Sequence, residues 1–154
     1  FPYTPVQWNA RFCLSKPAIH TLAFGIAEPE QFNEIKGIFP TSIPLTMDDQ
    51  EIKHNLDKRE LFDKYASYEG YELQGDPSGI NIPDILRLRK LWKCYGMKEF
   101  AQYRYNTLEP NDTWFPGNFA TPENIARINI DKVPDNIPLK EMLLETHKAL
   151  YKKK

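Results

Sequence analysis

The chain has 154 residues, of which 41% are hydrophobic and 27% charged, a balance typical of a globular protein rather than a disordered or fibrous one. This length suffices for one ordinary domain with its own core, or for a small domain with an appendage. The 20 Lys and Arg against 21 Asp and Glu give a formal net charge of −1, whereas a dedicated nucleic-acid-binding protein would be clearly basic. We therefore expect no nucleic-acid partner.

Cysteine content and hydropathy indicate where the protein works. Cys13 and Cys94 are too few for a disulfide scaffold and show no CxxC or Cys/His spacing, which favours a reducing, cytoplasmic compartment. No apolar run approaches the roughly 18 residues of a membrane span, so no membrane partner is expected. The chain opens on Phe1 without an initiator Met or a signal-peptide pattern, and we expect it to be a fragment of a longer protein.

The first forty residues have the pattern of an α/β protein. A capping Thr followed by Pro predicts a helix over residues 6–15. The short apolar stretch 18–25 is bounded by Pro and Gly, and it predicts a buried strand. An acidic first turn at Glu28 predicts a second helix with Phe32 and Ile35 facing inward. The order helix–strand–helix is the repeating unit of α/β folds.

The sequence beyond the prolines at 40 and 44 predicts helices and no convincing strand. Thr46 is placed to cap a helix over residues 48–65. Its predicted inward side chains recur at helical spacing: Ile52, Leu56 and Leu61/Phe62.

The segment 81–108 gives the strongest local signal, that of an αα-hairpin. Asn81 can cap the first helix, Pro83 lies in its first turn, and Gly96 can close it in the left-handed conformation. The second helix is predicted over residues 97–108. The side chains expected to face inward are Ile85, Leu88, Trp92 and Tyr95 on the first helix, and Phe100, Tyr103 and Leu108 on the second.

Two more helices are predicted towards the end of the chain. Thr121-Pro122 marks the start of a short one, and Pro138 the start of the last. The last helix carries an apolar stripe formed by Leu139, Met142, Leu143, Thr146 and Leu150.

No pattern in the sequence identifies a catalytic site. It contains no nucleophile elbow, phosphate-binding P-loop, HExxH zinc motif or GxGxxG fingerprint. His20, His54 and His147 are far apart and have no patterned acid partners, so we interpret them as structural or exposed. The pair Asp48-Asp49 could act as paired carboxylates, but two acids in the first turn of a helix are the commoner explanation.

Two clusters remain open to a functional or a structural interpretation. Five cations of the hairpin could dock an acidic partner or form a solvated helix face: Arg87, Arg89, Lys90, Lys93 and Arg104. Seven aromatic residues could line a ligand cradle or pack beneath a long loop: Tyr65, Tyr68, Tyr71, Tyr103, Tyr105, Trp114 and Phe115. The structural interpretation is the commoner one in both cases.

The turn after Gly25 is the one place where backbone chemistry suggests a ligand. A strand that ends there and a helix that begins at Glu28 would present free N–H groups at a helix N-terminus, where phosphates bind in α/β folds. This pattern alone is weak, because any turn from a strand to a helix shares it.

Residues 7–34 resemble the end of an aldo/keto reductase. In that family a helix leads into the last barrel strand, and a loop with a Pro-Glu-Gln helix then grips the adenosine end of a nicotinamide cofactor, as Pro29-Glu30-Gln31 would here. The resemblance implies NADP or NAD as cofactor. It assigns cofactor contacts to Gly25, Ile26, Ala27, Gln31 and Glu34. Ala27, Glu28 and Ile35 depart from the family pattern, and the added acid weakens recognition of a 2′-phosphate.

The second half resembles the helical C-terminal extension of the ferredoxin-like branch of the same family. The similarity lies in residues 79–85 (Gly-Ile-Asn-Ile-Pro-Asp-Ile), 95–97 (Tyr-Gly-Met), 101–106 (Ala-Gln-Tyr-Arg-Tyr-Asn) and 114–118 (Trp-Phe-Pro-Gly-Asn). Relatives that hold a [4Fe–4S] cluster carry several cysteines just before the first of these motifs. Residues 71–78 contain no cysteine, so we expect no iron–sulfur cluster in this chain.

Together these features predict a mostly helical chain with one α/β unit. Residues 1–39 would be the helix–strand–helix end of a (β/α)8 barrel, and residues 40–154 an all-helical, clusterless ferredoxin-like domain. The parent would be an NAD(P)-dependent oxidoreductase whose catalytic residues lie in the remainder of the barrel, outside this chain, so whether the chain itself is an enzyme stays open. The alternative is a stand-alone helical docking module derived from an electron-transfer domain.

Overall fold

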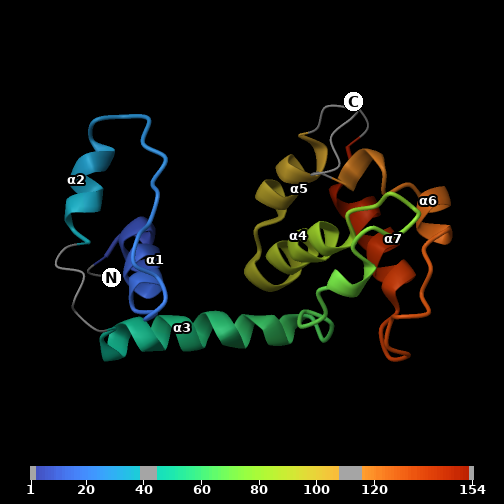
Figure 1. The fold of residues 1–154 in the computed structure, drawn as a ribbon, viewed down its shortest axis with the longest axis horizontal. Helices are drawn as coiled ribbons and strands as arrows, with labels where there is room; N and C mark the ends of the chain where they lie inside the picture. Colours follow the sequence, from blue (N-terminus) through green and yellow to red (C-terminus); the bar gives the residue numbers. More distant parts are fainter. Residues whose placement is uncertain (1–2, 39–44, 108–115, 153–154) are drawn as a thin grey trace. The chain divides into compact units, whose positions relative to one another are not determined.

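The computed structural model describes residues 3–38, 45–107 and 116–152, and within these ranges every regular element is a helix (Figure 1). Contacts divide the chain into two units, Phe1–Asn55 and Leu56–Lys154. The division lies within helix α3 (Met47–Arg59), rather than at residue 39. None of the described helices combines the length and the apolar character needed to cross a bilayer.

The first helix of unit 1 has the predicted start. Helix α1 spans Pro5–Leu14, and the Thr4 hydroxyl accepts a hydrogen bond from the Gln7 N–H at 3.3 Å. The Gln7 side chain accepts in return from the Thr4 N–H at 3.1 Å, which completes a capping box. Trp8 and Phe12 stack with ring centroids 5.4 Å apart.

The buried strand predicted at residues 18–25 is absent. This stretch is an irregular connection from α1 to α2, most of it exposed, and Phe24 is among its exposed residues (Figure 1). A strand is defined by hydrogen bonds to a neighbouring strand, and no described residue supplies one. The prediction of a buried strand is therefore wrong for the described chain, in both its conformation and its burial.

Helix α2 spans Gln31–Lys36 and begins later than the predicted start at Glu28. Ile35 is half-buried, but Phe32 is 56% exposed, so its predicted inward orientation is wrong. The helix contacts α1 and makes no described contact that would cover Phe32. Six residues are too few to present a wide apolar stripe to one neighbour.

Unit 1 contains very little core. Among its described residues, the buried hydrophobic side chains are Ala10 and Ile38. The other two buried residues, Arg11 and Asp49, are charged. Burial of apolar surface is the main favourable contribution to folding, and ordering each backbone residue costs roughly 1–2 kcal/mol. The described part of unit 1 therefore lacks the usual means of stabilising itself.

Helix α3 begins with the predicted cap. The Thr46 hydroxyl accepts from the Asp49 N–H at 3.2 Å, while Asp49 Oδ2 accepts from the Thr46 N–H at 2.8 Å. The helix ends at Arg59 rather than at residue 65, and a 3-10 turn, η1 (Glu60–Phe62), follows.

The apolar residues around η1 face outward, contrary to prediction. Leu61 is 82% exposed and Phe62 is 72% exposed. The carboxylates of this segment turn towards α4 (Ile82–Tyr95) instead, since Glu60 pairs with Lys90 and Asp63 pairs with Arg89. The ion pairs and the change to a 3-10 turn thus decide which side of the segment faces α4.

Helix α4 confirms the predicted first half of the hairpin. Asn81 accepts from the Asp84 N–H at 3.3 Å at the start, and Gly96 ends the helix in the left-handed conformation with φ of 70°. Ile85 and Leu88 are fully buried. The predicted stripe is completed by the partly buried Trp92 and Tyr95.

Helix α5 spans Lys98–Asn106 and faces its neighbours with a different side from the predicted one. Ala101 and Tyr105 are fully buried, whereas Phe100 and Tyr103 are exposed; Leu108 lies outside the described residues. The reason is close packing. A Cβ on Gly117, in the 3-10 turn η3 (Pro116–Asn118), would lie 2.1 Å from the Tyr105 carbonyl oxygen.

The last two helices confirm their predicted starts, and the last one confirms its predicted inward face. Helix α6 spans Pro122–Ala126 with Thr121 as its cap, and α7 spans Leu139–Leu150. The buried residues of α7 are the five predicted ones, Leu139, Met142, Leu143, Thr146 and Leu150. Figure 1 shows α7 beside α4, α5 and α6, and their apolar side chains form one core with the 3-10 turn η2 (Tyr71–Leu73).

The difference in core content predicts a difference in protease resistance. Brief trypsin digestion of the full chain should cut within residues 1–55 first and leave a resistant fragment that contains α4 to α7. Protease susceptibility follows local opening, and openings are easiest where few apolar contacts are buried. Mass spectrometry of the fragments identifies the cuts. Early cleavage after Arg87 or Lys140, both within helices of unit 2, would contradict the expectation.

Candidate functional site

The residues predicted to contact a cofactor lie in unit 1: Gly25, Ile26 and Ala27 in the connection from α1 to α2, and Gln31 and Glu34 in α2. Gly25 and Ala27 are exposed, and Ile26 is half-buried. Gly25 has no positive φ, and a Cβ there would meet no atom within 4 Å. No described residue therefore comes close enough to residue 25 to require a glycine there.

The Gln31 side chain binds the backbone N–H groups that the sequence analysis considered as a site for a phosphate. Its side-chain oxygen Oε1 accepts from the Ala27 N–H at 2.8 Å and from the Glu28 N–H at 3.3 Å. The N–H groups at this turn are therefore bound by the chain itself. Gln31 holds the loop closed, a role that spacing alone did not predict.

Glu34 connects the two helices of unit 1 through its backbone. Its carbonyl oxygen accepts from Gln7 Nε2 at 2.8 Å, and its side chain is half-buried. The same Gln7 side chain completes the capping box of α1. A Cβ on Gly37 would lie 2.3 Å from Gln7 Nε2, so Gly37 leaves room for this contact.

The charge of this loop fits one part of a dinucleotide better than another. Glu28, Glu30 and Glu34 bring three carboxylates to residues 25–34, and the segment has no Lys or Arg. Carboxylates accept hydrogen bonds from the hydroxyl groups of a ribose, and they repel phosphate. With Gln31 on the backbone donors, the loop offers carboxylate acceptors for hydroxyl groups, and the Ala27 and Glu28 N–H groups are not free to bind a phosphate.

The basic face of the hairpin is largely neutralised by pairing. Arg89 lies at the centre, with its Nε 2.9 Å from Asp63 Oδ2 and its Nη1 2.5 Å from Glu145 Oε2. The Asp63 contact is short but poorly aligned for a hydrogen bond, so its attraction is chiefly ionic. Further ion pairs of this face are Lys93–Glu145, Lys90–Glu60 at 2.7 Å and Arg87–Asp84 at 2.7 Å. These cations therefore do not form a free docking patch, although Arg87 is solvent-exposed.

The seven aromatic residues do not form a cradle in the described structure. Tyr105 is fully buried in the core, and Tyr65 and Tyr68 pack against that core. Tyr71 and Tyr103 are exposed. Trp114 and Phe115 lie outside the described residues. The described members thus belong to different surroundings, as the packing interpretation expects.

A buried ion pair in unit 1 escaped the sequence analysis. Arg11 Nη2 lies 3.3 Å from Asp49 Oδ2, and both side chains are almost wholly buried. Burial by itself would raise the pKa of Asp49, but hydrogen bonds from Thr46 and the Arg11 guanidinium outweigh it and hold this pKa below its ordinary value. The sequence indicated that Asp49 lies in the first turn of the helix capped by Thr46, but not that it pairs with Arg11, 38 residues away.

The histidine and cysteine side chains that could do acid–base chemistry are dispersed over both units. His20 and His54, in unit 1, are exposed, whereas His147 Nδ1 lies 3.0 Å from the Tyr105 hydroxyl. Cys94 is buried and free, and burial raises the pKa of its thiol. In the described parts of the chain, no three His, Cys, Asp or Glu side chains gather as metal ligands would.

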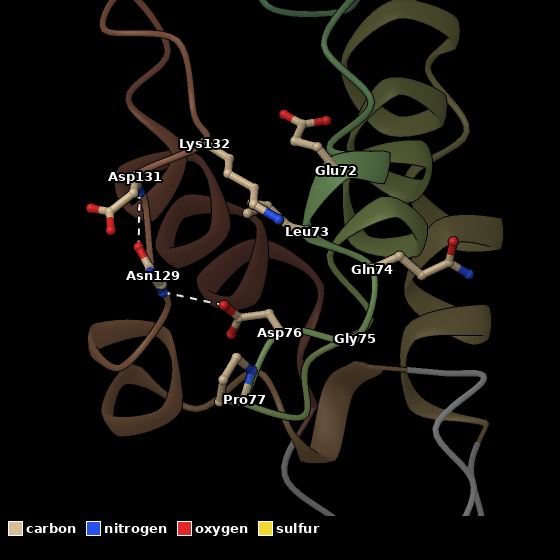
Figure 2. A pocket seen from close by; sticks show the side chains of 9 residues that line it. All are labelled: Glu72, Leu73, Gln74, Gly75, Asp76, Pro77, Asn129, Asp131 and Lys132. Carbon is tan, nitrogen blue, oxygen red and sulfur yellow. Dashed lines mark hydrogen bonds between the residues drawn. The ribbon is translucent and has the colours of Figure 1, made fainter.

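A shallow pocket of about 250 Å³ lies between residues 72–77 and 129–132 (Figure 2). Its polar groups bind one another, since Asp76 Oδ2 accepts from the Asn129 N–H at 3.2 Å and Asn129 Oδ1 accepts from the Asp131 N–H at 2.8 Å. Partial burial would raise the pKa of Asp76, but hydrogen bonds from Ser78 and Asn129 hold it below its ordinary value. The pocket is thus a junction between two loops.

Comparison with known protein families, curated proteins and solved structures finds no match to this chain.

Proposed function

We propose that this chain is the C-terminal part of an NAD(P)-dependent oxidoreductase of the aldo/keto reductase type. The parent enzyme would move a hydride between a nicotinamide ring and a carbonyl carbon. This chain would supply the loop at the adenosine end of the cofactor, and unit 2 would act as a helical cap. The acid–base residues would belong to the remainder of the barrel.

The incomplete state of unit 1 is the observation that carries this proposal. Residues 20–26 make no backbone hydrogen bond to any described residue, although their sequence is that of a buried strand. The unpaired backbone groups of this exposed segment are free to bond neighbouring strands, and those strands would also bury apolar side chains such as Phe24. A barrel that flanks this segment on two edges would supply those strands.

The loop geometry supports a positioning role rather than a catalytic one. Gln31 fixes the Ala27 and Glu28 backbone, and Glu34 ties the loop to α1. A loop held in this way can orient the adenosine of a cofactor whose reactive ring lies elsewhere. The nicotinamide, when bound, would supply the hydride, and residues of the remainder of the barrel would move the accompanying proton.

The stand-alone docking module is the less favoured alternative. Its electrostatic basis was the cationic face of the hairpin, and four of those five cations are paired with carboxylates of unit 2. Arg104 also has a partner within the chain. The charges that would have attracted an acidic protein are already engaged.

Cofactor binding by the full-length protein and by this chain alone tests the proposal. The full-length protein should bind NADH or NADPH and reduce a carbonyl substrate, whereas the 154-residue chain should bind neither cofactor at micromolar concentration. One loop keeps a fraction of the contacts, while association still costs about 4–15 kcal/mol. Calorimetry on both proteins measures this. Micromolar binding by the chain alone would show a self-contained site, and no binding by the full-length protein would refute the proposal.

Two glutamine-to-alanine substitutions, one in the loop and one outside it, test the role of the loop in cofactor binding. In the full-length enzyme Gln31→Ala should raise the KM for the cofactor and leave kcat nearly unchanged, because the loop loses its internal hydrogen bonds. Gln102→Ala, in α5 of unit 2, should change neither constant. Equal effects of the two substitutions would argue against a cofactor role for the loop.

A further inference from the structure

The ends of α5 and α7 are joined by three polar contacts. Asn106 makes two of them, since its Nδ2 donates to the Leu150 carbonyl at 2.8 Å and its Oδ1 accepts from the Lys152 N–H at 2.8 Å. The third joins the Tyr105 hydroxyl to His147 Nδ1 at 3.0 Å. We call these three contacts the α5–α7 latch.

The Tyr105 contact requires a neutral histidine. Tyr105 is fully buried, and burial raises the pKa of its hydroxyl well above the ordinary value, so the O–H proton stays in place. Among the described residues, His147 Nδ1 is the acceptor for that proton. Nδ1 can accept only while it is unprotonated, which places the ring proton of neutral His147 on Nε2.

A cationic His147 breaks this arrangement. With protons on both ring nitrogens, Nδ1 becomes a donor that faces another donor, the Tyr105 O–H. The Tyr105 oxygen could then accept from Nδ1, but its own proton would need a new acceptor, and the described residues around it provide none. A buried hydroxyl without an acceptor is costly, so the helix ends gain by separating.

The surroundings of His147 favour the neutral form. Burial lowers the pKa of His147, and the Glu123 carboxylate of α6 opposes this shift incompletely because it is exposed. On the other side the Tyr151 ring stacks at 4.6 Å without a charge. The α4 cations bind Glu145, which is about 200° around the α7 helix from His147. Among the described residues, Glu123 is the charged group that acts on the imidazole.

We propose that the α5–α7 latch is acid-sensitive: protonation of His147 releases the end of α7 from α5, while the rest of the unit 2 core stays folded. The two hydrogen bonds of Asn106 are then lost as well, because they hold Leu150 and Lys152 at the end of the same helix. Release is confined to the last turn, which carries Leu150 out of the core, because Leu139, Met142, Leu143 and Thr146 hold the rest of α7 in place.

The direction of the pH effect follows from the lower pKa in the folded chain. The latch contributes its full stability above the unfolded-state pKa of about 6.5. That contribution is lost as the pH falls through 6.5 towards the lower folded-state value, because the unfolded chain then binds more protons. Acid therefore weakens the latch, and neutral or alkaline conditions preserve it.

Amide exchange and histidine NMR on the full 154-residue chain test the latch. Between pH 8 and pH 5, after correction for intrinsic exchange, the Tyr151 and Lys152 amides should lose protection, while amides in the centre of α4 should keep theirs. The NMR chemical shifts of these two amides should change with pH in parallel with the titration of the His147 ring. Protection that stays constant across the titration of His147 would overturn the proposal.

Two variants separate protonation from a merely structural role. His147→Asn places an uncharged acceptor, Oδ1, near the position of Nδ1, so the latch should persist at pH 5 and its pH dependence should vanish. His54→Asn removes an exposed histidine from unit 1 and should leave the pH dependence unchanged. If the His147→Asn chain does not fold, the wild-type titration still decides. A wild-type pH dependence retained in His147→Asn would refute the latch.

Discussion

Replacing Leu143 with alanine should lower the free energy of unfolding of unit 2 by about 2–5 kcal/mol, the usual cost of emptying a buried leucine site. Leu143 is fully buried on α7, in the core that this helix shares with α4, α5 and α6. A domain has only about 5–15 kcal/mol of stability in total, so the variant should lose a large part of its resistance to urea. Urea unfolding followed by circular dichroism measures the loss.

The adjacent leucine is the matched control. Leu144 stands on the same helix, has the same chemistry and is 40% exposed. Leu144→Ala should change the free energy of unfolding by about 0.5 kcal/mol or less, as is usual for surface substitutions. If Leu144 proved as costly as Leu143, the face that α7 turns to the core would have been misassigned.

Replacing Arg89 with methionine should cost about 3–5 kcal/mol, because it leaves a buried carboxylate without its partner. The Arg89 and Asp63 side chains are 6% and 7% exposed, and their ion pair joins α4 to the segment that follows η1. Arg89 also binds Glu145 of α7, so three segments meet at one guanidinium. The same urea experiment measures the loss.

Two further variants identify the physical cause. The double variant Arg89→Met, Asp63→Leu should recover much of the loss, since an apolar pair avoids the desolvation that the ions undergo. Arg87→Met removes an exposed ion pair with Asp84 and should cost about 0–1 kcal/mol. A double variant as unstable as Arg89→Met would show that packing of the Arg89 side chain, rather than the unpaired charge, is what matters.

Interactions within a few residues of one another could be predicted from the sequence. The caps at Thr4, Asn81 and Thr121 depend on a side chain and an N–H three residues later, and all three form as expected. Gly96 ends α4 in the left-handed conformation for the same local reason. The stripe of α7 was predicted residue by residue because a long amphipathic helix has only one apolar face to bury.

The hydrogen bonds of the candidate cofactor loop could not be predicted from local sequence patterns. The sequence identified its residues, but not that Gln31 would take the backbone donors of Ala27 and Glu28. A glutamine side chain can adopt many rotamers, and the path of the turn decides which of them reaches a donor. The strand at 18–25 failed for a related reason, since its formation depends on residues that the described chain does not supply.

Local patterns correctly predicted that most of the described chain is helical, where most helices begin, and which face of α4 and α7 enters the core. The packing of helices against one another set the inward side of α5 at Ala101 and Tyr105, the contact of Asp49 with Arg11, and the pairing of the hairpin cations. Helix caps and stripes are set by neighbours within about one turn. Ion pairs across 38 or 56 residues, and the close approach of Gly117 to Tyr105, depend on how whole helices pack, which no local pattern encodes.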